Sequence, residues 1–142
     1  MNPFGIAWIQ LETFSHATED IEKVKFLLSK FFSYDITFIQ NKTYGHFGNE
    51  IIMVKVELTK NREIKDFISN FLSIVNKDYL LETIEKRIDE DGVLFIRMSK
   101  ERVYNDDFII DDNGDILLSM KFVTYPKNRE RVIENGKLLF HN

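Results

Sequence analysis

Two short polar segments of this chain combine histidine with residue types suited to surface chemistry. The first is His16–Asp20 (HATED) and the second is Gly45–Asn49 (GHFGN). Each lies beside an apolar alternating pattern, at a point where a strand is expected to end. An imidazole can donate, accept or carry charge, and glycine lets backbone approach a ligand closely. We therefore expect surface function to lie in these two segments.

The second segment has the chemistry that RNA binding requires. Lys42 supplies a cation just before it, and Tyr44 and Phe47 offer rings. Single-stranded RNA is held by stacking of its bases and by donors to its phosphates. His46 and Asn49 add hydrogen-bonding side chains to the predicted RNA site. The alternative is a structural loop whose glycines adopt positive φ and whose histidine packs locally.

The first segment favours a structural interpretation. Thr18 is suited to cap a helix that begins after it. The free amides of a helix N-terminus can hold a phosphate, but Glu19 and Asp20 in the first turn would repel one. His16 belongs to the predicted RNA site if it shares a groove with His46, and otherwise it is structural.

A basic group near the end of a predicted strand completes the candidate RNA site. Arg97 shares a strand face with Val93 and Phe95, so it either contacts RNA or is partly buried and paired with an acid. Lys100 and Arg102 are expected to be solvated. Runs of basic residues more often form a solvated surface than a binding site, and a solvated surface remains the alternative for this group.

The motifs for metal binding and catalysis are weaker than the pattern for RNA binding. Asp111–Asp115 looks like a calcium loop, but placing Gly114 at the sixth position puts Ile109 at the first ligand position. Two histidines in separate loops define no zinc site, and the chain contains no cysteine. We find no phosphate-binding GxxxxGK[ST] loop and no arrangement of nucleophile and base. The sequence therefore predicts no cofactor, no metal and no enzymatic activity.

The chain as a whole has the composition of one folded domain spanning residues 1–142. It is 44% apolar and 30% charged, and its net charge is −4. The acidic total argues against bulk electrostatic binding of nucleic acid, although the part from Lys121 onward has more bases than acids. With no long apolar run and no start resembling a signal peptide, we expect a cytoplasmic protein without membrane contact.

The hydrophobic periodicity predicts the elements that position these residues. Strands are predicted over 9–13, 35–40, 52–58, 93–98, 108–110 and 116–123, and helices over 18–31, 64–75, 80–88 and 128–134. Asp111–Gly114 is predicted to be a hairpin turn, and Gly136 to stop the last helix. This order indicates an α+β fold, with a single mostly antiparallel sheet and helices packed on one face. Among the 13 phenylalanines, Phe4, Phe32 and Phe140 lie near element ends and either cap the core or form a dimer contact.

Several motifs together resemble a known family. They are His16–Val24 (HATEDIEKV), the GHFGN segment, Arg87–Asp89 with Arg97 and Lys100, and Tyr125-Pro126 before a basic helix. They are similar to an archaeal RNA-binding family predicted to be an exosome subunit, and the resemblance covers nearly the whole chain. It implies a fold like that of the large-subunit ribosomal protein that binds the small ribosomal RNA. It also implies RNA binding and association with exosome subunits.

The chain departs from the family's usual pattern beside the second segment. Where the family usually has proline, this chain has Glu50, which adds a negative charge. Together with the acidic stretch from Asp89 to Asp115, this charge motivates an alternative function. In that alternative the protein is an interaction subunit or a homodimeric scaffold without RNA affinity of its own.

Overall fold

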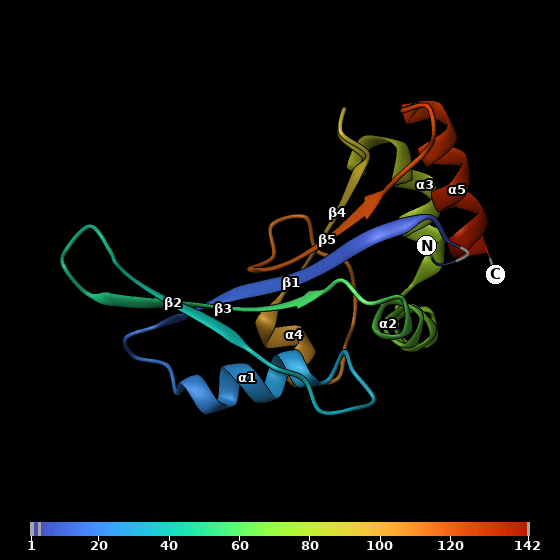
Figure 1. Ribbon diagram of the computed structural model, residues 1–142. Coiled ribbons are helices and arrows are strands. Elements are labelled where there is room, and N and C mark those ends of the chain that lie inside the picture. The colour runs from blue at the N-terminus through green and yellow to red at the C-terminus, as the bar shows by residue number, and fades with distance from the viewer. Residues whose placement is uncertain (1, 3, 142) are drawn as a thin grey trace.

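One antiparallel β-sheet forms the centre of the molecule (Figure 1). The computed structural model describes residues 2 and 4–141. Within them the five strands lie in the order β2–β3–β1–β5–β4, and each neighbouring pair is antiparallel. Their bounds are β1 (Ile6–His16), β2 (Ile39–Tyr44), β3 (Glu50–Leu58), β4 (Val93–Met98) and β5 (Ile116–Phe122). The first strand of the chain thus occupies the middle of the sheet, and the predicted α+β class is confirmed.

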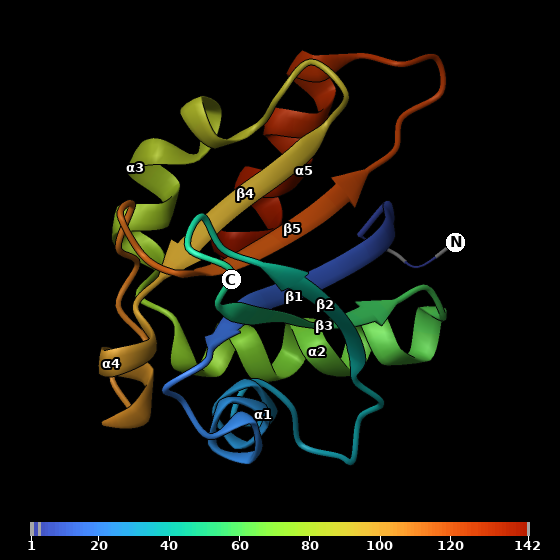
Figure 2. The ribbon, with the colours of Figure 1, turned by 90° about the vertical axis from the view of Figure 1, so that its left-hand side faces the viewer.

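The helices leave one face of this sheet uncovered. They are α1 (Ile21–Ser29), α2 (Asn61–Ile74), α3 (Lys77–Arg87), α4 (Lys100–Tyr104) and α5 (Arg129–His141). Figure 2 shows the strands in front of α2 and α5, with α1 below the sheet and α3 to the side of β4. None of the helices in the described part of the chain has the length and apolar composition needed to cross a bilayer.

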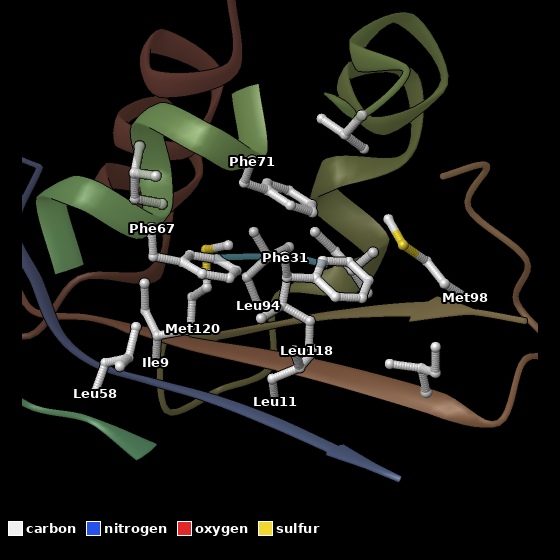
Figure 3. Packing of buried hydrophobic residues seen from close by; sticks show 14 of the residues in the cluster. Ile9, Leu11, Phe31, Leu58, Phe67, Phe71, Leu94, Met98, Leu118 and Met120 are labelled. Atoms are coloured by element: carbon white, nitrogen blue, oxygen red, sulfur yellow. The ribbon is translucent and has the colours of Figure 1, made fainter. Parts of the chain in front are cut away.

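The core lies between the helices and the covered face of the sheet. Figure 3 shows Phe67 and Phe71 of α2 pointing toward sheet residues such as Ile9 and Leu118. The two rings are stacked, with their centroids 5.6 Å apart. The spacing of four residues places both rings on the same helix face, as the amphipathic pattern predicts.

Phe4, Phe32 and Phe140 belong to this core. Phe140 is fully buried, with its ring edge-on to Phe71, and Phe32 is buried against Phe67. Phe4 is partly buried and packs on the same cluster. Of the two interpretations of these rings, the structure therefore supports core packing over a dimer contact.

β2 lies later in the chain than predicted. The strand runs over Ile39–Tyr44 instead of 35–40, and all six of its residues are exposed. Because β2 is an edge strand that extends beyond the helices, neither of its faces is buried. An alternating apolar signal is therefore missing, and the sequence pattern could not locate the strand.

The predicted strand over 108–110 is wrong. Ile110 forms only an isolated bridge with Met98, while β4 pairs directly with β5. The connection between these strands instead contains α4, whose N-cap Ser99 accepts a hydrogen bond from the backbone of Arg102. Asp111–Gly114 is accordingly a turn before β5 and does not join two long strands.

Gly136 does not stop the last helix, because α5 continues to His141. The glycine is buried where α5 packs against α3. A Cβ atom at this position would lie 2.9 Å from Cδ1 of Ile84. The glycine therefore permits close helix packing, so its predicted role as a C-terminal signal is wrong.

Candidate functional site

The β2–β3 hairpin extends away from the body of the molecule, on the left in Figure 1. We call its turn, Tyr44–Asn49, the hairpin tip. The backbone N–H of Gly45 donates to the carbonyl of Asn49 at 2.7 Å, and that of Gly48 donates to the carbonyl of Gly45 at 2.9 Å. Gly48 has a φ of +78°, which side chains with a Cβ rarely adopt. Glycine is therefore favoured at position 48 by the backbone conformation of the turn.

The hairpin tip presents aromatic rings to solvent. The side chain of Phe47 is 92% exposed and that of Tyr44 is 66% exposed. His46 is exposed as well and lies edge-on to Phe47, with 5.0 Å between the ring centroids. Asn49 is also exposed. These rings contribute nothing to the core and are available to a ligand.

The cation predicted beside the tip has an acidic partner. Nζ of Lys42 lies 3.6 Å from the carboxylate of Glu50, and both side chains are substantially exposed. The residue that replaces the family's usual proline thus partly neutralises Lys42. An exposed pair of this kind is weak, because water competes for both ions. Lys42 can therefore still exchange its partner for a phosphate.

The first polar segment has a structural role that differs from the predicted one. Asp20, not Thr18, is the N-cap of α1, and its carboxylate accepts from the N–H of Glu22 at 3.0 Å. Glu19 accepts from the backbone N–H of His16 at 3.1 Å and from Nζ of Lys100 at 2.9 Å. The segment thus closes the turn between β1 and α1 and anchors it to α4.

The ionisation of Glu19 reflects these contacts. Partial burial raises the pKa of this carboxyl, but the hydrogen bonds from Lys100 and the His16 backbone outweigh it. The net result is a pKa below the ordinary value. Glu19 therefore stays ionised at neutral pH, and its charge is balanced by the Lys100 ammonium.

His16 lines a hollow of about 260 Å³ between β1, β3 and the start of α1. Glu19 and Glu50 line the same hollow, whereas His46 does not. This hollow therefore does not join the two histidines. Glu19 is balanced by Lys100, but Glu50 has only the weak, exposed pair with Lys42, so the hollow favours an anion less than the hairpin tip does.

The expectation that Lys100 is solvated is wrong. Its side chain is buried, and Nζ donates to the carbonyl of Phe14 at 2.7 Å as well as to Glu19. All its hydrogen-bonding capacity is directed inward, because an ammonium without partners cannot be buried cheaply. Lys100 is therefore part of the protein's internal structure.

The two arginines are exposed but do not gather at the hairpin tip. Arg102 pairs with Asp107 at 3.1 Å, and both side chains reach solvent. Arg97 is exposed on β4, where Nη1 donates to the carbonyl of Gly114 at 3.3 Å. β4 and β2 are opposite edges of the sheet, four strand spacings of about 4.8 Å apart. Arg97 and the tip thus belong to different parts of the surface.

The uncovered sheet face contains residues that the sequence pattern did not single out. We define the open face by the side chains that point away from the helices: Trp8, Gln10, Glu12, Phe14, Lys55, Glu57, Phe95, Arg97, Leu117, Ser119 and Lys121. The alternation in β1 could have located this face in the sequence. Ile9 and Leu11 are buried, so their neighbours along the strand must point to the opposite face. Within residues 2 and 4–141, no group of three or more histidine, aspartate and glutamate side chains could hold a metal ion.

The fold and these surfaces define a class of protein: an α+β domain with an uncovered sheet face and a projecting aromatic hairpin. A family model described as RNA binding matches residues 8–124. The chain therefore belongs to this RNA-binding family.

Relatives of the chain are similar over nearly their whole length. The RNA-binding protein PAB1135 of Pyrococcus abyssi is 33% identical over 135 residues, covering 89% of this chain and 88% of that protein. The crystal structure of AF2318 from Archaeoglobus fulgidus has a TM-score of 0.86 at 39% identity, covering 94% of this chain and 99% of that one. Mth689 from Methanothermobacter thermautotrophicus has a TM-score of 0.80 at 28% identity, covering 95% and 98%. Both structures are described as DUF54 proteins.

Proposed function

We propose that this protein is a non-catalytic RNA-binding protein that contacts RNA with its hairpin tip. The observation that carries the proposal is the almost complete exposure of Phe47, beside the exposed rings of Tyr44 and His46. Membership of the RNA-binding family supports it.

The chemistry of the tip suits unpaired nucleotides. Bases stack on aromatic rings regardless of their identity, and each stacked base contributes about 1–3 kcal/mol to binding. Lys42, held only by an exposed pair with Glu50, is close enough in sequence to serve a phosphate. We assign binding without catalysis, because in the described residues His46 has a ring contact with Phe47 but no hydrogen-bonded acid or nucleophile.

Replacing His46 and Phe47 together by alanine is expected to weaken binding of a single-stranded oligoribonucleotide about tenfold, the loss of roughly one stacked base. Because neither ring contacts the core, the unfolding temperature should stay within a degree or so of the parent's. Fluorescence anisotropy measures the affinity, and circular dichroism measures the stability.

Phe26→Ala is the matched control for this experiment. Phe26 is 62% exposed but lies on α1, on the helical side of the sheet. The Phe26→Ala variant should bind RNA as tightly as the parent does. Parent-like binding by the His46→Ala/Phe47→Ala protein would show that the tip is not the RNA site.

The proposal extends to association with an RNA-processing complex such as the exosome, which the family resemblance implies. We expect the protein to co-elute with reconstituted archaeal exosome subunits when RNA is present. The His46→Ala/Phe47→Ala protein, called the tip variant below, should lose this co-elution if RNA bridges the protein and the exosome subunits. Separate elution of the parent under all conditions would remove the exosome from the proposal and leave RNA binding in place.

A protein-interaction subunit without RNA affinity is the second candidate. It is favoured by the acidic hollow beside the hairpin, which Glu19 and Glu50 line. Phosphate contacts release counterions, so RNA affinity should fall steeply between low and moderate salt, whereas an aromatic protein contact should change little. Absence of RNA binding even at low salt, together with a dimer in light scattering, would favour this candidate.

A further inference from the structure

We propose that the open face is a base-stacking platform for single-stranded RNA, with Trp8 and Phe95 contacting bases and Arg97 and Lys121 contacting phosphates. This inference rests on the proposed RNA-binding function and names the class of RNA. It concerns a surface separate from the hairpin tip.

Strand register places these four side chains in adjacent rows of the sheet. Lys121 is the cross-strand partner of both Trp8 and Val93, which forms one row. In the next row Ser119 lies between Phe95 and Gln10. Partners across antiparallel strands have their Cβ atoms about 5 Å apart, so the two rings and Lys121 form one continuous patch.

Arg97 extends the patch by one further row. Its cross-strand partner is Leu117, which in turn pairs with Glu12. No helix covers these rows, as the view onto the strands in Figure 2 shows. The patch therefore reaches from the middle of the sheet to its β4 edge.

The aromatic part of the patch is accessible and includes polar groups suited to a base. Phe95 is 38% exposed. Trp8 lines a hollow of about 250 Å³ together with Gln10, Glu57 and Thr59. This volume is below the roughly 300–1,000 Å³ of pockets that enclose whole small molecules. An amide and a hydroxyl beside a ring can hydrogen-bond the edge of a base that stacks there.

The uncompensated charge on the open face is positive. Arg97 and Lys121 donate to the backbone carbonyls of Gly114 and Asp91, and no carboxylate of the described residues forms a salt bridge with either. The Asp91 carboxylate, which lies near Lys121, is paired with Lys127 at 3.0 Å. Lys121 and Lys127 together exceed the single Asp91 carboxylate by one positive charge, and Arg97 forms no salt bridge in the described residues.

The open face has three cations, Lys55, Arg97 and Lys121, and two carboxylates, Glu12 and Glu57, so one positive charge is left over. Nζ of Lys55 lies 3.1 Å from Glu57, and Glu12 is its cross-strand partner from β1. Alternating rings and cations match the alternating bases and phosphates of a nucleic-acid strand. In a duplex the bases are stacked inside and cannot reach such a surface, so the ligand is single-stranded.

Trp8 is the only tryptophan in the chain, so its fluorescence reports directly on this face. A short oligouridine should quench it, with a midpoint equal to the dissociation constant from anisotropy, and a duplex RNA should not. Phe95→Ala and Arg97→Ala should each weaken oligouridine binding about tenfold. Arg62→Ala is the matched control, because Arg62 is exposed on α2 on the opposite side of the sheet.

The outcomes separate this inference from the proposed function. The tip variant should bind more weakly yet still show full quenching at saturation. The platform would be overturned if anisotropy showed RNA binding while Trp8 emission stayed unchanged and the Phe95→Ala and Arg97→Ala variants bound like the parent. The hairpin tip would then remain the RNA site. Self-association that Phe95→Ala abolishes would also overturn it, because the face would then bind a second copy. No RNA binding by the parent would overturn both.

Discussion

Replacing Gly114 by alanine is expected to lower the free energy of unfolding by about 3 kcal/mol, the upper end of what overpacking usually costs. A Cβ atom at this buried position would overlap the carbonyl group of Met98 and lie 2.9 Å from the carbonyl oxygen of Asp111. These are backbone atoms, which cannot move aside as the end of a flexible side chain can. Denaturant unfolding followed by circular dichroism measures the change.

Gly114→Ala should also displace Arg97 on the open face, because both residues belong to one hydrogen-bonded segment. The carbonyl of Gly114 accepts from Arg97, and the N–H of Asp111 donates to the Arg97 carbonyl at 2.8 Å. Gly48→Ala is the control, because a Cβ there meets no atom within 4 Å and only the positive φ of the tip opposes it. That variant should lose about 1 kcal/mol. Equal losses for the two variants would contradict the steric explanation for Gly114.

Replacing Lys100 by methionine is expected to cost about 2 kcal/mol of unfolding free energy. Breaking a fully buried ion pair costs more, about 3–5 kcal/mol, but the partner Glu19 is partly exposed and water can solvate it. Methionine retains much of the apolar stem and removes the donor to Glu19 and Phe14. Denaturant unfolding at neutral pH measures the loss.

The pH dependence of this loss is a second readout. Because the folded pKa of Glu19 is lowered, its contribution to stability is fully present above the ordinary value of 4.5. The contribution is lost as the pH falls through the lowered pKa. The stability difference between the parent and Lys100→Met should therefore shrink in acid, and a difference that stays constant would contradict the ion-pair explanation.

A double replacement provides the matched control. Glu19→Gln keeps an acceptor for the His16 N–H but removes the charge. Adding it to Lys100→Met should recover part of the lost stability, since no unpaired carboxylate then remains near the protein interior. A further loss in the double variant would show that the methionine acts through packing instead.

Much of the fold could be predicted because periodicity is a local property. The stripe that includes Phe67 and Phe71 identified α2, and alternation identified β1 and β3. Elements without a buried face, such as β2, were misplaced by several residues. Gly48 of the hairpin tip was also predictable, because its positive φ favours glycine.

By itself the sequence determined the α+β class, the amphipathic elements and an aromatic turn rich in glycine. Only the tertiary structure decided which charges are free. Lys100 and Glu19 are 81 positions apart, yet they form a pair, while Arg97 on an edge strand has no acid partner in the described residues. Spacing predicts neighbours on one element, but the partner of a charge on another element depends on strand order and register. For the same reason, Trp8 and Lys121 became parts of one surface only when β1 paired with β5.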